Sequence, residues 1–124
     1  MQDERKLSLT DVEWRIMRAL WTLGEPTLGD IVREVADAGW SRHAVISFLK
    51  RLEQKGAVHI DTARRPSRYM ARLSQQDAQR SETAAVLRRV FGGNLMLMVT
   101  NAVDSGELSD QETQALIDLL KKGG

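Results

Sequence analysis

SRHAVISFLKRLEQKG, residues 41–56, predicts a single helix with a defined start and a defined end. The hydroxyl of Ser41 can accept a hydrogen bond from an unpaired N–H of the first turn. Gly56 suits the left-handed residue that often follows a helix end. An apolar stripe recurs at the helical spacing i, i+3, i+4 and i+7, and its members are Val45, Phe48, Leu49 and Leu52.

The opposite side of this helix carries no acidic residue. A helix anchored by an apolar stripe, with short polar groups and cations facing outward, is typical of a DNA recognition helix. An ordinary amphipathic surface helix is the alternative for this segment taken alone. The outward side holds His43, Ile46, Ser47, Lys50 and Gln54, with Arg42, Arg51 and Lys55 at its flanks.

Positive charge is concentrated in the middle of the chain, although the whole 124-residue chain has a net charge of only +1. Residues 42–72 contain 8 Lys or Arg and 2 Asp or Glu, a net charge of +6. Residues 1–41 carry −3 and residues 73–124 carry −2. A local basic patch in a nearly neutral protein favours a nucleic-acid partner.

Two helices are expected before this stretch. Residues 10–13 read TDVE, a capping box that precedes an apolar run to about Leu23. A second box, TLGD at residues 27–30, opens a helix that ends at Gly39. Only a few residues separate this helix from the next, which is the spacing of a helix-turn-helix.

After Gly56 the pattern changes to that of a β-hairpin. Residues 57–61 are rich in β-branched side chains and predict a strand, and residues 68–73 predict its return. The segment between them contains Pro66 and reads as a turn. A hairpin after a helix-turn-helix is a winged helix, and its arginines are expected to reach phosphates or a minor groove. They are Arg64, Arg65 and Arg68, and simple solvation at a turn is the alternative for them.

Three further helices are expected after the hairpin. Residues 95–99, LMLMV, are apolar all round and too short to span a membrane. About 50 residues in three helices cannot easily bury such a segment alone, so a two-fold dimer is expected to cover it. A small apolar ligand is the alternative. The expected dimer residues are Leu95, Met96, Met98, Val99, Leu116, Ile117 and Leu120.

Several classes of function are not supported by the composition. The chain has no cysteine, which excludes disulfides and thiolate metal sites, and we expect no cofactor. Neither His43 nor His59 has a carboxylate at a catalytic spacing, and no glycine-rich phosphate loop is present, so an enzyme is not expected. No signal peptide and no long apolar run occur. We therefore expect a cytoplasmic protein without membrane insertion.

Residues 8–122 resemble the penicillinase-repressor family, whose members are the BlaI/MecI-type winged-helix repressors. This family also includes the CopY copper-responsive repressors. The match depends on several motifs together rather than on any one of them. They are LTDVEWRIMRALW at residues 9–21, WSRHAVISFLKRLEQKG at 40–56, RYMARL at 68–73, FGGNL at 91–95 and ELSDQE at 107–112.

The resemblance implies a homodimeric repressor that binds a dyad-symmetric operator and controls β-lactamase-type or related stress genes. It also implies release by cleavage through a membrane sensor-protease pathway, within the region that is residues 94–104 here. The family's cleavage bond is Asn-Phe, whereas the corresponding pair in this chain is Asn101-Ala102. The cysteine-rich tail of the copper-responsive branch is absent. Ile46 stands where the family often has a polar or basic residue, and it could contact a thymine methyl group.

Together these observations predict a mostly α protein with a small β-hairpin. Residues 1–8 would form a flexible arm, residues 9–73 a winged helix-turn-helix domain, and residues 74–124 a three-helix dimerisation domain. The expected function is a DNA-binding transcriptional repressor; the alternative is a winged-helix module that docks an acidic protein partner. The residues expected to contact DNA are Arg42, His43, Ile46, Ser47, Lys50, Arg51, Arg64, Arg65 and Arg68.

Overall fold

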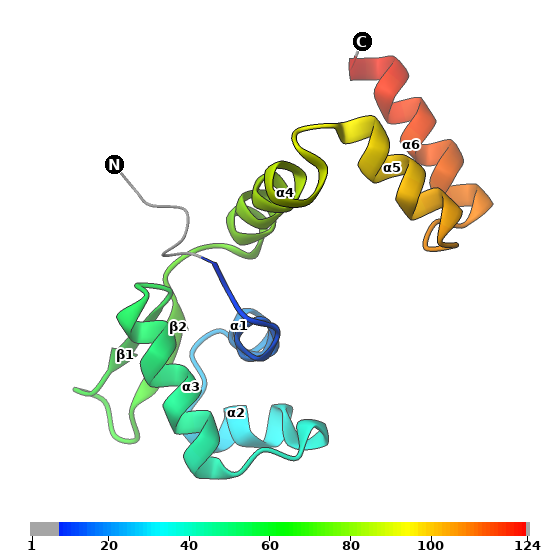
Figure 1. The fold of residues 1–124 in the computed structure, drawn as a ribbon. Helices are drawn as coiled ribbons and strands as arrows, with labels where there is room; N and C mark the ends of the chain where they lie inside the picture. The colour runs from blue at the N-terminus through cyan, green and yellow to red at the C-terminus, as the bar shows by residue number, and fades with distance from the viewer. Residues whose placement is uncertain (1–7, 124) are drawn as a thin grey trace. The chain divides into compact units, whose positions relative to one another are not determined.

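The order of elements follows the prediction of a winged helix with a helical C-terminal part (Figure 1). The computed structural model describes residues 8–123, so residues 1–7 of the predicted arm and the side chain of Leu120 lie outside the description. The chain divides into two units, one ending at Glu82 and the other beginning at Thr83. The elements are α1 (Asp11–Leu23), α2 (Leu28–Glu34), the 3-10 helix η2 (Ala36–Ala38), α3 (Arg42–Gln54), β1 (Val58–Asp61), β2 (Arg68–Ala71), α4 (Gln75–Phe91), α5 (Leu95–Asp104) and α6 (Asp110–Gly123).

Both predicted capping boxes are present in the first unit. The Thr10 hydroxyl accepts the Glu13 N–H at 3.2 Å, and the Glu13 carboxylate accepts the Thr10 N–H at 2.9 Å. Thr27 and Asp30 repeat this exchange at the start of α2, at 3.2 and 3.0 Å. Each box satisfies two backbone donors that a helix start leaves unpaired, so α1 and α2 begin where the sequence predicts.

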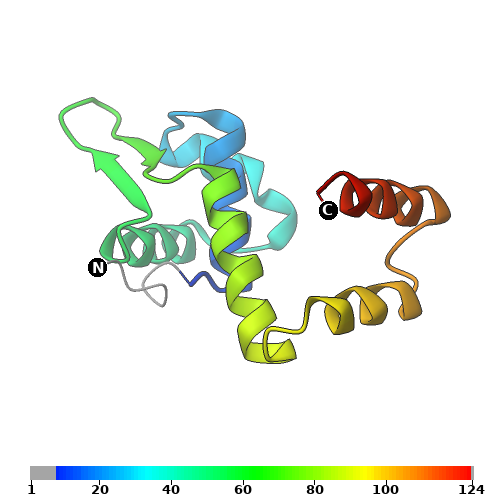
Figure 2. The same cartoon turned by 90° about the horizontal axis from the view of Figure 1, so that it is seen from above.

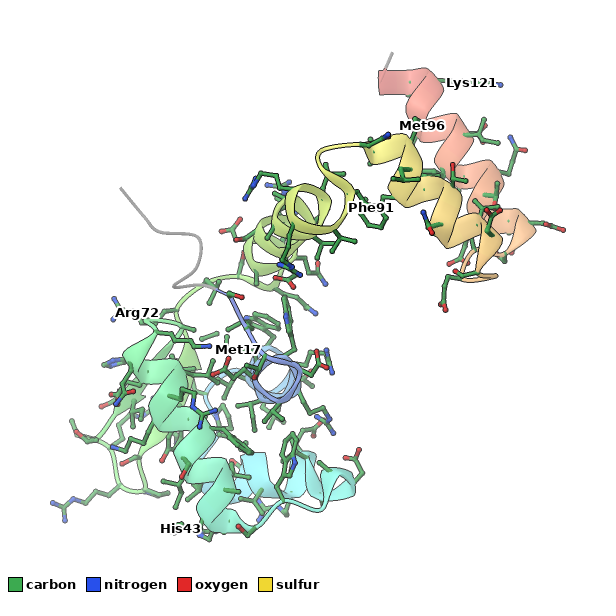
Figure 3. The ribbon with its side chains drawn as sticks, viewed as in Figure 1. Met17, His43, Arg72, Phe91, Met96 and Lys121 are labelled. Atoms are coloured by element: carbon green, nitrogen blue, oxygen red, sulfur yellow. The ribbon has the colours of Figure 1, made fainter. Side chains whose placement is uncertain are left out.

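The hydrophobic core of the first unit lies between α1, α2, α3 and the hairpin. Met17 lies in the space between α1 and α3 (Figure 3). Phe48 of the predicted stripe is only half-buried; its ring meets Trp40 edge-on with 5.2 Å between the ring centres. The fully buried side chains of this core include Ile16, Met17, Leu20, Ile31, Val35, Val45, Leu49, Leu52 and Val58.

The hairpin extends from the helices of the first unit as a wing (Figure 2). β1 and β2 are antiparallel, with Val58 opposite Ala71 and Asp61 opposite Arg68. Both strands are shorter than predicted, although the Arg72 N–H still donates to the Ala57 carbonyl at 2.8 Å. On the other edge of β2, the Tyr69 N–H donates to the Pro26 carbonyl at 2.9 Å. The loop between α1 and α2 is therefore hydrogen-bonded to the wing.

Two tryptophans of α1 lie close together, and one of them is hydrogen-bonded to the segment before α4. Trp14 and Trp21 are half-buried, with their ring centres 6.0 Å apart. The indole N–H of Trp21 donates to the Leu73 carbonyl at 3.0 Å, just before α4 begins. This bond attaches the chain after the wing to α1.

The second unit contains most of the exposed large apolar side chains of the described residues. Gly92 and Gly93, with φ of 57° and 85°, separate α4 from α5. Consecutive left-handed residues of this kind favour glycine and end a helix. The Asn94 side chain then accepts the Leu97 N–H at 2.9 Å and caps α5. The exposed apolar residues of this unit are Val90, Leu95, Met96, Leu97, Val103, Ile117 and Leu119.

Candidate nucleic-acid interface

Helix α3 buries one side and exposes the other. Val45, Leu49 and Leu52 are all 0% exposed, which fixes the rotation of the helix about its axis. Ala44 and Ile46, on either side of Val45 in the sequence, are half-buried. The exposed residues of α3 include the predicted DNA contacts Arg42, His43, Ser47, Lys50 and Arg51. We call His43, Ile46, Ser47 and Lys50 the reading face.

The first turn of α3 presents side chains suited to a nucleic-acid groove. The Ser41 hydroxyl accepts the Ala44 N–H at 3.0 Å and caps the helix. His43 then lies at the N-terminal end of the helix, exposed to solvent (Figure 3). In helix-turn-helix proteins the N-terminal residues of the second helix contact base edges. The reading face begins at the corresponding place in this helix.

Lys55 does not flank the reading face as the sequence suggested. Its ammonium nitrogen lies 2.5 Å from Oε1 of Glu13 and 2.9 Å from the Ser8 carbonyl. Glu13 is 0% exposed. Burial raises the pKa of Glu13, but hydrogen bonds from Lys55 and Thr10 and the Lys55 charge outweigh it, so that its pKa is lowered. Sequence reasoning found Glu13 only as a capping residue, because its pairing with Lys55 spans 42 positions.

The three predicted wing arginines have different surroundings. Arg64 Nη1 lies 2.6 Å from Oε1 of Glu25, and Arg68 Nη1 donates to the Glu25 backbone carbonyl at 2.8 Å. Arg65 is exposed, and within residues 8–123 no side chain or carbonyl holds its guanidinium. The structure thus brings Arg64 and Arg68 to the loop between α1 and α2 and leaves Arg65 at the tip of the wing.

The positions singled out in the C-terminal helices are mostly accessible. Leu95, Met96 and Ile117 are exposed, whereas Met98, Val99 and Leu116 are half-buried. Asn101 is exposed and Ala102 half-buried, and both lie inside α5. The Asn101 side-chain amide donates to the Leu97 carbonyl at 2.9 Å. The side chain of Leu120 lies outside the described residues.

The described part of the chain offers neither a metal-holding cluster nor a membrane-spanning helix. Residues 8–123 hold no group of three or more His, Asp or Glu side chains placed to hold a metal ion. In the same range, no helix has both the length and the apolar character needed to cross a membrane.

Comparisons with known proteins agree with this geometry. Residues 9–122 match the family model described as penicillinase repressor. The penicillinase repressor of Bacillus licheniformis is 24% identical over 115 residues, covering 92% of this chain and 90% of that protein. The methicillin resistance regulatory protein MecI of Staphylococcus aureus strain N315 is 22% identical over 121 residues, covering 97% and 98%.

A solved structure supports the fold. It is that of BpsR from Bordetella bronchiseptica, described in terms of the regulation of its DNA binding by 6-hydroxynicotinic acid. The TM-score is 0.50 at 20% identity, covering 98% of this chain and 78% of that one. The family match over residues 9–122, together with the winged helix and its exposed reading face, leads to one conclusion: the chain belongs to the penicillinase-repressor family of DNA-binding winged-helix transcriptional repressors, which are not enzymes.

Proposed function

We propose that this protein represses transcription by binding a dyad-symmetric DNA operator as a homodimer and occluding a promoter. The observation that carries the proposal is that His43, Ser47 and Lys50 of the reading face are exposed, while Val45, Leu49 and Leu52 on the opposite side of α3 are fully buried. A helix held this firmly can present side chains to a major groove without having to reorganise.

Each residue of the interface has a role in this proposal. His43, Ser47 and Lys50 face base edges, where hydrogen bonds discriminate between base pairs. Ile46 supplies an apolar contact to a thymine methyl group. Arg42, Arg51 and Arg65 hold phosphates, which position the protein but carry no direct sequence information. Glu25 holds the other two wing arginines, Arg64 through its carboxylate and Arg68 through its backbone carbonyl.

A dimer would place two reading faces on successive turns of the same side of DNA. The 13-residue α3 is about 20 Å long. Two such helices about 34 Å apart would match two half-sites one helical turn apart. This arrangement predicts an inverted repeat in the operator.

The second unit is the proposed source of the dimer contact. Met96 is 64% exposed and Leu119 is 66% exposed, and five further large apolar side chains of the second unit are also exposed. Exposed apolar side chains in such number favour an interaction site. Since a two-fold operator needs a two-fold protein, we propose that a second copy of the chain covers it.

The proposal also covers which genes the protein regulates and how it is released from DNA. The names of the relatives, penicillinase repressor and methicillin resistance regulatory protein, suggest genes of β-lactam defence. Release would occur through a membrane sensor-protease pathway that leads to cleavage near Asn101 and Ala102. Both residues accept helix-ending hydrogen bonds, from the Ser105 and Glu107 N–H groups. Cleavage there therefore requires α5 to open first.

The decisive experiment is a selection of genomic fragments retained by the purified protein at about 150 mM salt, followed by footprinting. Enrichment of one inverted repeat upstream of genes is the expected result. Lys50→Ala should lose the base preference at one position in each half of the repeat, whereas Lys122→Ala, which removes the same charge from the second unit, should keep it. Retention of DNA without any shared motif, or binding that is insensitive to salt, would contradict the proposal and favour docking of an acidic protein.

A further inference from the structure

We propose that Glu25 acts as an internal competitor for DNA phosphate, by holding the guanidinium of Arg64 in the unbound protein. This inference rests on the proposed DNA binding and adds a residue to it. Glu25 lies in the loop between α1 and α2, outside both the reading face and the hairpin. It would lower the part of the affinity that does not depend on DNA sequence.

The geometry places one wing cation directly on this carboxylate. Arg64 Nη1 lies 2.6 Å from Glu25 Oε1, although 39 positions separate the two residues along the chain. The hydrogen bond with Glu25 raises the pKa of Arg64, against an opposing effect of desolvation, and the charges of Glu25 and Asp61 raise it further. Arg64 therefore faces two acidic groups, whereas no acidic group among residues 8–123 holds Arg65.

Backbone contacts hold the Glu25 loop in place beside the wing. Arg68 Nη1 donates to the Glu25 carbonyl at 2.8 Å, and the Tyr69 N–H donates to the Pro26 carbonyl at 2.9 Å. These two bonds come from consecutive residues of β2. Since they fix the loop at residues 25 and 26, the Glu25 carboxylate stays within reach of Arg64 while the wing keeps its shape.

A carboxylate in this position can bind an arginine side chain in the same way as a phosphate group. Both are anions whose oxygens accept charge-assisted hydrogen bonds from a guanidinium. The Arg64 and Glu25 side chains are 46% and 54% exposed, so the ion pair is weak enough to be exchanged. While the pair persists it is locally neutral, and Arg64 displaces no counterion from DNA.

Removing the competitor should therefore make DNA binding tighter and more salt-dependent. Glu25→Gln should add about 0.9 to the slope of log affinity against log salt for each protomer bound. It should tighten binding roughly 5- to 10-fold per protomer at about 100 mM salt. The affinity of Glu25→Gln should increase equally for operator and unrelated duplexes, because a phosphate contact carries no sequence information.

The test is a double-mutant cycle measured on both duplexes over a range of salt. Arg64→Gln should have little effect in the wild-type background and should remove the whole gain in the Glu25→Gln background. Glu34→Gln is the matched control, because it removes an exposed negative charge from the same unit without touching the wing. In the unbound protein, the ion pair should slow the rotation of the Arg64 guanidinium group, which its NMR signals report. This slowing should disappear in Glu25→Gln.

The possible outcomes separate the inference from the proposed function. A wild-type protein that bound neither duplex would overturn the proposed function and this role with it. If the wild type bound DNA, three results would each overturn the inference alone. The first is weaker DNA binding by Glu25→Gln than by the wild type. The second is an increase in DNA affinity no larger than that caused by Glu34→Gln. The third is an increase in DNA affinity that persists in the Glu25→Gln/Arg64→Gln protein.

Discussion

Oε1 of the buried Glu13 accepts from the Thr10 N–H at 2.9 Å and lies 2.5 Å from the ammonium nitrogen of Lys55. One oxygen atom thus joins the first turn of α1 to the residue that follows α3. Helix α3 is anchored at its end by this ion pair and along its length by apolar packing. Because Glu13 is fully buried, removing its partner leaves a charge in the core.

Lys55→Met should destabilise the first unit strongly. Breaking a buried pair by removing one partner costs about 3 kcal/mol or more, because the remaining charge is uncompensated. The midpoint of urea denaturation should fall accordingly. Lys50→Met is the matched control, since Lys50 is exposed and surface substitutions change stability by about 0.5 kcal/mol or less. An equal shift for both variants would show that the Glu13 pair does not stabilise the fold.

The Glu13 pair also predicts how stability depends on pH. The folded protein lowers the pKa of Glu13 below its ordinary 4.5, so the pair stabilises the fold fully above that value. This contribution is lost as the pH falls through the lowered pKa. In Lys55→Met, the Glu13 carboxylate stays buried with only Thr10 as a partner. Protonation of Glu13 in acid then removes an unfavourable buried charge, so acid destabilises this variant less than the wild type. The stability difference between wild type and Lys55→Met should therefore shrink on acidification, and urea titrations from pH 7 down to about pH 3 should detect it. A constant difference across that range would contradict this role.

Lys50 and Arg65 should affect DNA binding in different ways. Lys50→Ala should reduce discrimination at one position of each half-site, by about 1–3 kcal/mol against the wrong base pair. Arg65→Ala should weaken all duplexes about equally and lower the salt slope, because it removes a phosphate contact. Dissociation constants for operator and single-substitution duplexes at several salt concentrations measure both. If Arg65→Ala changed only sequence preference, the assignment of the wing tip to phosphates would be wrong.

Met96→Lys should separate the proposed dimer into protomers. The Met96 side chain is 64% exposed within one chain, and a buried lysine at an interface would be strongly unfavourable. Sedimentation equilibrium should show a lower mass for this variant. Leu23→Lys is a suitable control, since Leu23 is an exposed leucine of the first unit. A dimer that survives Met96→Lys would place the interface elsewhere.

Limited proteolysis should cut the chain first between α4 and α5. Residues 92–94 are exposed and non-helical, and Asn94 has an extended backbone with φ −88° and ψ 94°. The bond between Asn101 and Ala102 lies inside α5, which has to open locally before a protease can bind it. Mass spectrometry of early fragments from a protease of broad specificity would locate the cut. An initial cut at Asn101-Ala102 would mean that α5 opens more easily than its hydrogen bonds suggest.

Local features of the fold could be predicted from the sequence because their determinants are close together in the chain. The Thr10 and Thr27 capping boxes and the stripe of Val45, Leu49 and Leu52 occur where expected. The pairing of Lys55 with Glu13 and of Arg64 with Glu25 could not be predicted. Each joins charges about 40 positions apart, and only the packed structure determines which of many charges meet. For the same reason Lys55 was wrongly expected beside the reading face.

All three tryptophans of the chain, Trp14, Trp21 and Trp40, belong to the first unit. The indole of Trp21 is also hydrogen-bonded to the carbonyl just before α4. Intrinsic fluorescence therefore reports melting of the first unit only, whereas far-ultraviolet circular dichroism reports helices in both units. Coincidence of the two melting curves would mean that the halves unfold as one cooperative body, and a gap between them would mean that each melts on its own. The native sequence thus carries its own optical label for the unit that contains the winged helix.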